Sequence, residues 1–339
     1  MSSLLCLIAR FSRPALHTLR QRAFSLTSQK RRIASDPISS DKSGAIQPIQ
    51  LPSSASLFKK REYLVPLKVS FMPANDEKEV IPEFKGTNSG CINPLSEPNT
   101  RFKYCLDVNI QEEYVCTGID RKILQDADFN VYDHNCITDP DIQTFLYKLH
   151  DVVFNGLQIV GTDETFTDTL VDDLLRIAKL NSYPFKIRNH PPCKLYIGEE
   201  SYISSFPEFV VKNENFFIVS VEDKHLKNVK PGSDYGELQM AIEILACGDE
   251  NKRHINLNKW TDQTIYAVRV ISTFVTFYKT TISKKYWDEL IDGFPKIHSV
   301  VIQRWPGENG IDTGLDLSEP NGRKAILTAF SKIRQSFVK

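Results

Sequence analysis

The stretch that decides the fold is SSFPEFVVKNENFFIVSVEDKHLKN, Ser204–Asn228, which places two carboxylates and an amine within apolar, β-branched runs. An unpaired charge on a buried strand costs free energy, so these side chains need a reason to be there. The polar run Lys212–Asn215 predicts a turn that joins the two runs into a hairpin. Glu208, Glu222 and Lys224 are therefore the first candidates for a functional site.

Alternation along the strands places these three side chains on one surface. Residues of equal parity share a face, so Glu208 faces the same side of the hairpin as Glu222 and Lys224. A turn centred near Glu214 puts Glu208 opposite Ser220 and diagonal to Glu222. Diagonal neighbours lie about 7–8 Å apart, within reach of long side chains. The pattern predicts an acidic pocket with a lysine at its rim.

Such a pocket suits the hydrolysis of phosphodiesters. Two nearby carboxylates repel each other unless a cation lies between them. Mg²⁺ prefers carboxylate oxygens and keeps several of its waters. A metal in this position lowers the pKa of a bound water and polarises a phosphoryl oxygen. Lys224 would orient that water or offset the charge that develops on the phosphate.

A Pro-acid pair, a short hairpin and an acid-x-Lys triplet between two helices resemble the PD-(D/E)XK nuclease superfamily. The resemblance covers roughly residues 160–285, including a strand similar to one in uncharacterised fungal members. Pro207-Glu208 matches the PD position, and Glu222-Asp223-Lys224 matches the (D/E)XK position. The resemblance implies a restriction-endonuclease-like core that binds Mg²⁺ or Mn²⁺ through both acids and the main-chain carbonyl of Asp223.

The resemblance also implies catalytic residues on the flanking helices. An acid on the first helix maps best to Glu164, with Asp168 as the second choice. A glutamine on the next helix maps to Gln239, and Glu243 stands where some members carry a tyrosine. Glu164 also fits a first-turn acid that favours the helix dipole, and Gln239 also fits a residue that satisfies backbone groups.

One departure from the family pattern leaves the function open. The PD position is usually aspartate, and the extra methylene of Glu208 moves the carboxylate, whereas Mg²⁺ geometry is demanding. We therefore expect a metal-dependent nuclease acting on DNA or RNA, or an impaired nuclease-fold protein that binds nucleic acid or protein. A scaffold in respiratory assembly or in the mitoribosome is a third possibility. The simplest alternative is a surface hairpin with solvated ion pairs, which the core-like run Phe216–Val221 opposes.

The order of periodic segments predicts an α+β fold, an α/β sandwich in which helices flank a mixed sheet. Helical patterns cover residues 139–157, 162–181, 234–248, 284–291 and 320–338, the third ending at a glycine stop, Gly248. Strand patterns cover residues 185–198, 206–211, 216–224, 265–282 and 298–305.

Composition divides the chain of 339 residues into four parts. Residues 1–35 are rich in Arg and Ser, free of acids and amphipathic, which predicts a transit peptide for the mitochondrial matrix. A basic N-terminus without an address is the alternative. Residues 36–56 predict a disordered linker, residues 57–158 an N-terminal extension or small accessory domain, and residues 159–339 the nuclease-like domain.

Charge and hydropathy limit the partners. Residues 1–35 hold seven of the 42 Lys and Arg residues and no acid, so residues 36–339 carry a formal charge of −7. Proteins that bind nucleic acid without sequence preference are usually basic, so this negative charge counts against that function. One group of basic and aromatic residues could follow a nucleic-acid backbone, or could be a solvated face. Its members are Lys279, Lys284, Lys285, Arg304, Tyr278, Tyr286 and Trp287. No apolar run is long enough to span a membrane, and the seven scattered cysteines predict free thiols.

Overall fold

The computed structural model describes residues 50–84, 112–134, 137–158, 163–199, 201–214, 216–224, 227, 229–254 and 261–338. All of them belong to one structural unit, Pro48–Lys339. The transit peptide predicted for residues 1–35 and most of the linker predicted for residues 36–56 lie outside the described residues.

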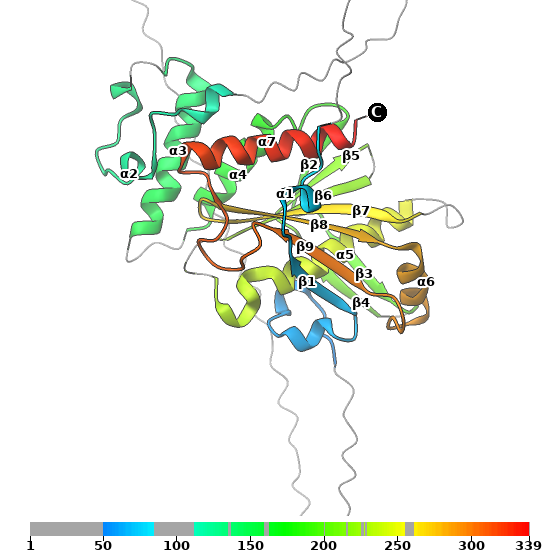
Figure 1. Cartoon of the computed structure of the whole chain (residues 1–339). Helices are drawn as coiled ribbons and strands as arrows, with labels where there is room; N and C mark the ends of the chain where they lie inside the picture. The colour runs from blue at the N-terminus through cyan, green and yellow to red at the C-terminus, as the bar shows by residue number, and fades with distance from the viewer. Residues whose placement is uncertain are drawn as a thin grey trace, which may run out of the picture. The chain divides into compact units, whose positions relative to one another are not determined.

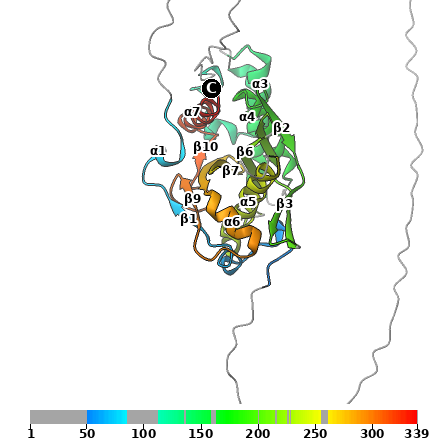
Figure 2. The same ribbon diagram turned by 90° about the vertical axis from the view of Figure 1, so that its right-hand side faces the viewer.

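A mixed sheet of eight strands forms the centre of the described structure, in the order β1-β9-β8-β7-β6-β5-β2 with β10 pairing to β8. Its strands are β1 (Val69–Pro73), β2 (Phe185–Asn189), β5 (Phe209–Asn213), β6 (Phe216–Lys224), β7 (Gln263–Ile271), β8 (Phe274–Ile282), β9 (Val300–Trp305) and β10 (Leu315–Asp316). The pairs β1–β9 and β6–β7 are parallel, and the other pairs are antiparallel. Figure 2 shows β1 and β2 at opposite edges. The predicted α+β fold is confirmed.

The helices lie on both sides of this sheet (Figure 1). In the described residues they are α1 (Glu77–Val80), α2 (Arg121–Leu124), α3 (Pro140–Leu157), α4 (Thr165–Ile177), α5 (Glu237–His254), α6 (Lys284–Asp292) and α7 (Pro320–Ser336). Short 3₁₀ turns are η1 (Ala55–Leu57), η2 (Arg61–Leu64), η3 (Glu112–Val115), η4 (Val131–Asp133) and η6 (Pro231–Gly236). None of the described helices is long and apolar enough to cross a membrane.

Helices α3, α4 and α7 cover one face of the sheet. Their apolar residues join those of β6, β7 and β8 in one buried cluster. The rings of Phe277 on β8 and Phe330 on α7 meet edge to face at 5.2 Å. Asp139 caps α3, because its side chain accepts from the backbone N–H groups of Asp141 and Ile142. Helix α4 packs in the same buried cluster as α3 and α7.

Helix α5 covers the other face, together with α6 and a separate two-stranded sheet of β3 (Cys193–Ile197) and β4 (Ser201–Ser205). The predicted helix stop at Gly248 is wrong, since α5 continues to His254. A Cβ atom on Gly248 would lie 2.6 Å from Cζ2 of the fully buried Trp287. This glycine therefore permits α5 to approach α6 closely.

Residues 57–158 contribute to the same sheet and core as the rest of the unit. β1 pairs in register with β9, and α3 lies in the buried cluster with α4 and α7. The predicted linker also ends earlier than residue 56. The carbonyl of Ser53 accepts from the N–H of Ser204, and Ala55 is buried.

A buried arginine, Arg323 on α7, joins this helix to the segment 112–119. Its guanidinium is fully buried and donates only to main-chain carbonyls. These carbonyls belong to Val115, Cys116, Ile119, Leu317 and Ser318. Burial lowers the pKa of Arg323, because no described carboxylate pairs with it at ion-pair distance.

Candidate functional site

The side chains of Glu208, Glu222 and Lys224 meet at the carboxyl end of β6. Lys224 Nζ lies 2.8 Å from Glu222 Oε1 and 3.6 Å from Glu208 Oε1, so one ammonium bridges both carboxylates. Glu222 is 1% exposed, whereas the side chains of Glu208 and Lys224 keep 22% and 20% of their surface in solvent. The site is therefore reached past Glu208 and Lys224, with Glu222 at its base.

The hairpin that brings them together has a different register from the predicted one. Val210 pairs with Ser220 and Phe209 with Val221, which places Glu208 directly across from Glu222. The difference is two residues along β6. A β-bulge next to Val211 adds one of them between the turn and the site, and the turn adds the other, because Asn213 pairs with Phe216 and the turn is therefore centred later than Glu214. The prediction that the two acids share one face still holds. Both side chains lie on the same face of the sheet as Val210, which packs in the cluster of α5.

Gln239 on α5 lies over the buried end of Glu222. Its Nε2 donates to Glu222 Oε1 at 2.7 Å and to Glu243 Oε1 at 2.9 Å. The expected alternative, that Gln239 satisfies backbone groups, is wrong. Because Gln239 and Glu243 are four residues apart, they occupy one face of α5 and reach the same partner.

Glu222 and Glu243 form a buried carboxyl pair. Both residues are at most 1% exposed. Among the described residues, neither Oε2 atom has a hydrogen-bond partner. Burial, and then the charge of Glu222, raise the pKa of Glu243 well above its ordinary value. Of the two acids, Glu243 is therefore the one that holds a proton more readily.

Electrostatics at the site keep Lys224 charged. Burial lowers its pKa, but Glu222, and less strongly Glu164 and Glu208, outweigh burial and raise it above the ordinary lysine value. For Glu222 burial dominates and raises the pKa, while Lys224 opposes that rise. The charge states of the Lys224 ammonium and of the two carboxylates thus depend on one another.

The other predicted site residues lie at different distances from this centre. Glu164 occupies the N-cap of α4 without a capping bond from its side chain, and its charge acts on Lys224. Asp168, the second choice, lies one turn into α4, and no described contact joins it to Lys224. Asp223 lies on β6, in register with Val270.

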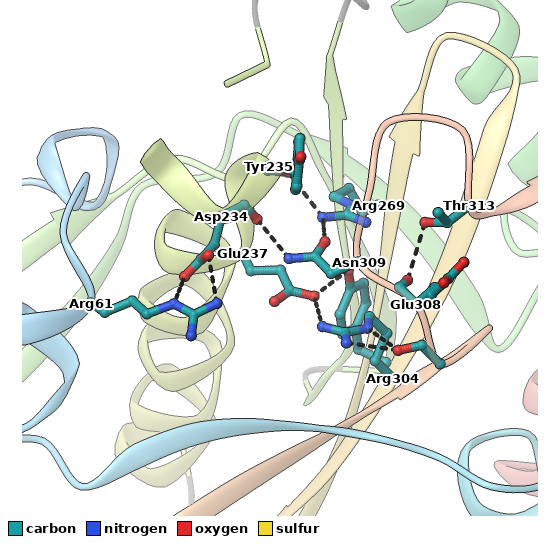
Figure 3. Close-up of polar contacts among 11 residues, drawn as sticks. Arg61, Asp234, Tyr235, Glu237, Arg269, Arg304, Glu308, Asn309 and Thr313 are labelled. Carbon is teal, nitrogen blue, oxygen red and sulfur yellow. Dashed lines mark hydrogen bonds and ion pairs between the residues drawn. The ribbon is translucent and has the colours of Figure 1, made fainter. Parts of the chain in front are cut away.

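The turn η6, which leads into α5, is held in place by contacts to distant segments (Figure 3). Arg61 binds Asp234 through two hydrogen bonds of 2.5 and 2.7 Å. Asp234 and Tyr235 both have left-handed backbone conformations, with φ of 48° and 53°. Their carbonyls accept from Asn309 and Arg269. Such strained residues persist only where their surroundings hold them, and these hold the turn that precedes Gln239.

Arg304 supports the same turn rather than a nucleic-acid surface. Its Nη1 donates to Glu237 Oε1 at 2.6 Å, and Tyr278 donates to the same oxygen (Figure 3). The predicted basic and aromatic group is therefore wrong as a binding face, because Tyr278, Tyr286 and Trp287 are fully buried. Its exposed members are Lys284 and Lys285 on α6.

Two residues at this site were missed from the sequence. Arg269 on β7 is 1% exposed and lies in register with Glu222. Its Nη1 donates to the Tyr235 carbonyl and to Asn309, whereas its Nε and Nη2 find no described partner. A charge inside an apolar strand was the signal that identified Glu222, and it also identifies Arg269. His190 Nδ1 lies 3.0 Å from Glu208 Oε2, a contact for which local sequence carries no signal.

No protein-family model and no curated protein matches this chain. The assignment of a function therefore depends on the geometry of the site.

A divalent cation at this site would have to lie between the two carboxylates. Glu208 Oε1 and Glu222 Oε1 lie 3.6 and 2.8 Å from Lys224 Nζ, so the two acids converge on one cationic group. Mg²⁺ commonly uses one or two carboxylates and completes its shell with water and substrate phosphate. The described residues contain no group of three or more His, Cys, Asp or Glu side chains arranged to hold a metal, so a site built wholly from such side chains is not present there.

Proposed function

We propose that this protein is a metal-dependent nuclease of the PD-(D/E)XK type that hydrolyses phosphodiester bonds in DNA or RNA. The observation that carries the proposal is the bridging of Glu208 and Glu222 by Lys224 at the open end of β6. One buried acid, one accessible acid and one accessible amine are the groups this chemistry needs. The match of Pro207-Glu208 and Glu222-Asp223-Lys224 to the family motif supports it.

Each side chain has a distinct role in this proposal. Glu208 and Glu222, with the main-chain carbonyl of Asp223, would hold Mg²⁺ or Mn²⁺. When bound, the metal supplies a more acidic water and a Lewis acid for the phosphate. Lys224 orients the attacking water and offsets the negative charge that grows on the phosphate. Gln239 fixes the carboxylate of Glu222 through a 2.7 Å hydrogen bond, which preserves its orientation.

A second candidate is a nuclease-fold protein with little or no activity that binds nucleic acid or another protein. The observation that favours it is the enclosure of Glu222. This carboxylate already pairs with Lys224 and accepts from Gln239, and it is 1% exposed. A bound metal would have to displace Lys224 from between the acids. The glutamate at position 208, one methylene longer than the family's usual aspartate, adds to this case.

Cleavage by the purified full chain separates the two candidates. We expect labelled DNA or RNA to be cut in Mg²⁺ or Mn²⁺ and left intact when the metal is removed with EDTA, because the carboxylates alone do not activate water. Denaturing electrophoresis of the products measures this. Cutting at the same rate in EDTA would contradict a metal-dependent reaction. Binding of nucleic acid without cleavage would support the second candidate.

We also propose that the chain acts in the mitochondrial matrix, which is supported by the basic, acid-free sequence of residues 1–35. Imaging of a tagged chain that lacks these residues tests this, and unchanged mitochondrial targeting would contradict it.

A further inference from the structure

The free edge of the sheet carries a row of cationic side chains. β2 is the last strand in the described sheet and pairs there with β5. Phe185 and Ile187 of β2 pack against the cluster of α3, α4 and α7. Because side chains alternate along a strand, Lys186 and Arg188 project from the opposite face, and both are exposed.

Lys212 on β5 joins this row. It pairs in register with Lys186, and its Nζ lies 4.1 Å from the ring centroid of Phe217. Burial, and then the nearby charges of Lys186 and Arg188, lower the pKa of Lys212. None of the ion pairs found within the described residues includes any of these three cations. The cations therefore repel one another. Among the described residues no acid lies within ion-pair distance of them, and the charge of Glu250 offsets only part of the effect on Lys212.

The row leads directly to the candidate site. Lys186 and Arg188 are two residues apart, a spacing of about 6.7 Å along an extended strand. His190 follows one residue after the end of β2, with a left-handed backbone φ of 45°. His190 Nδ1 contacts Glu208 Oε2 at 3.0 Å, and the His190 N–H donates to the carbonyl of Glu208. A polyanion that follows β2 would thus arrive at the accessible acid of the site.

Exposed aromatic rings stand at the two ends of this row. Tyr183, just before β2, is 80% exposed, and Phe206, two residues before Glu208, is 56% exposed. Large exposed rings beside a line of cations are the combination on which unpaired bases stack. Bases in a duplex are already stacked, so the arrangement favours a single strand.

We propose that Lys186, Arg188 and Lys212 form the binding surface for a single-stranded nucleic acid, whose backbone follows β2 toward Glu208. Tyr183 and Phe206 stack on its bases. The inference rests on the proposed function, since it supplies the path by which substrate reaches the site. It also places a local positive surface on a body whose residues 36–339 carry a formal charge of −7. Lysines on edge strands can instead serve to prevent pairing between sheets, and the test separates the two roles.

Fluorescence anisotropy of the full chain with labelled single-stranded oligo-dT and oligo-rU, in EDTA to prevent cleavage, tests this surface. The charge-removing variant is Lys186→Ala/Arg188→Ala, and the matched control is Lys284→Ala/Lys285→Ala, which removes the same charge from exposed positions on α6. We expect the first variant to bind at least ~10-fold more weakly and to lower the salt slope of log Kd by roughly 1.4, about 0.7 per phosphate contact. The control should match wild type, and the stronger of the two oligonucleotides identifies DNA or RNA as the substrate.

Phe206→Ala should weaken binding at least ~5-fold without changing the salt slope, because stacking carries no counterion release. Equal loss in the α6 control, or unchanged binding of the β2 variant, would overturn the proposal. So would a β2 variant that binds normally but self-associates in sedimentation, since the lysines then only protect the edge. Weaker binding by the β2 variant, together with no cleavage by the wild type, would support the surface and reject the nuclease. Cleavage by the wild type, with an unchanged KM in the β2 variant, would support the nuclease and reject the surface.

Discussion

Replacement of Lys224 by alanine should lower the rate of phosphodiester cleavage by roughly 10²–10³-fold, the usual effect of removing a group that stabilises transition-state charge. Lys224 is the one described amine within ion-pair distance of both Glu208 and Glu222. Its pKa is raised because these acids and Glu164 outweigh the effect of burial, so it carries its charge at neutral pH. Without it, neither the water nor the developing charge on the phosphate has a cationic partner from the protein. Single-turnover cleavage in Mg²⁺ measures the effect.

Lys230→Ala is the matched control for this variant. Lys230 is an exposed lysine six residues along the chain, and no described contact joins its side chain to the carboxylates. The control should retain the wild-type rate. Thermal unfolding of both variants shows whether they are folded, and Lys224→Arg keeps the charge where a second folded variant is needed. Cleavage by folded Lys224→Ala at the rate of Lys230→Ala would contradict the role of Lys224.

Replacement of Arg323 by methionine should lower the free energy of unfolding by about 3–5 kcal/mol, because several buried carbonyls lose their only described side-chain donor. Arg323 joins α7 to the segment 112–119 through hydrogen bonds such as Nε to the Val115 carbonyl at 2.8 Å. Methionine fills much of the same volume but donates nothing. Urea denaturation followed by circular dichroism measures the change.

Arg176→Met provides the control for Arg323. Arg176 is 52% exposed and pairs with Asp172 four residues earlier on α4. Exposed pairs of this kind contribute roughly 0–1 kcal/mol, so this variant should unfold close to wild type. An equal shift of the urea midpoint in the two variants would show that Arg323 does not anchor α7.

The sequence predicted those features of the site that depend on local periodicity. The alternation of side chains placed Glu208, Glu222 and Lys224 on one face, and the structure places them there. The register was wrong by two residues, because neither the bulge beside Val211 nor the exact centre of the turn has a local signature in the sequence. The helix stop predicted at Gly248 was also wrong. This glycine serves packing between helices, because a Cβ atom there would collide with Trp287 on α6.

Contacts between distant segments account for the other misses. Tyr278, Tyr286 and Trp287 alternate with basic residues, and only the packed structure shows that these rings are core. His190, one residue after the end of β2, reaches Glu208, which no spacing in the sequence predicts. Glu243 follows Gln239 at helical spacing, but its raised pKa depends on burial and on the charge of Glu222.

Mn²⁺ binding, measured by the loss of the free-ion signal in electron paramagnetic resonance, tests most directly whether the two acids share a cation. The full-chain wild type should bind Mn²⁺, and Glu208→Gln and Glu222→Gln should each weaken that binding at least ~10-fold, because each removes one of two carboxylate ligands. Glu214→Gln, in the exposed turn of the same hairpin, removes equal charge and should leave the affinity unchanged. Mn²⁺ affinity that is the same in all three variants as in wild type would contradict the account.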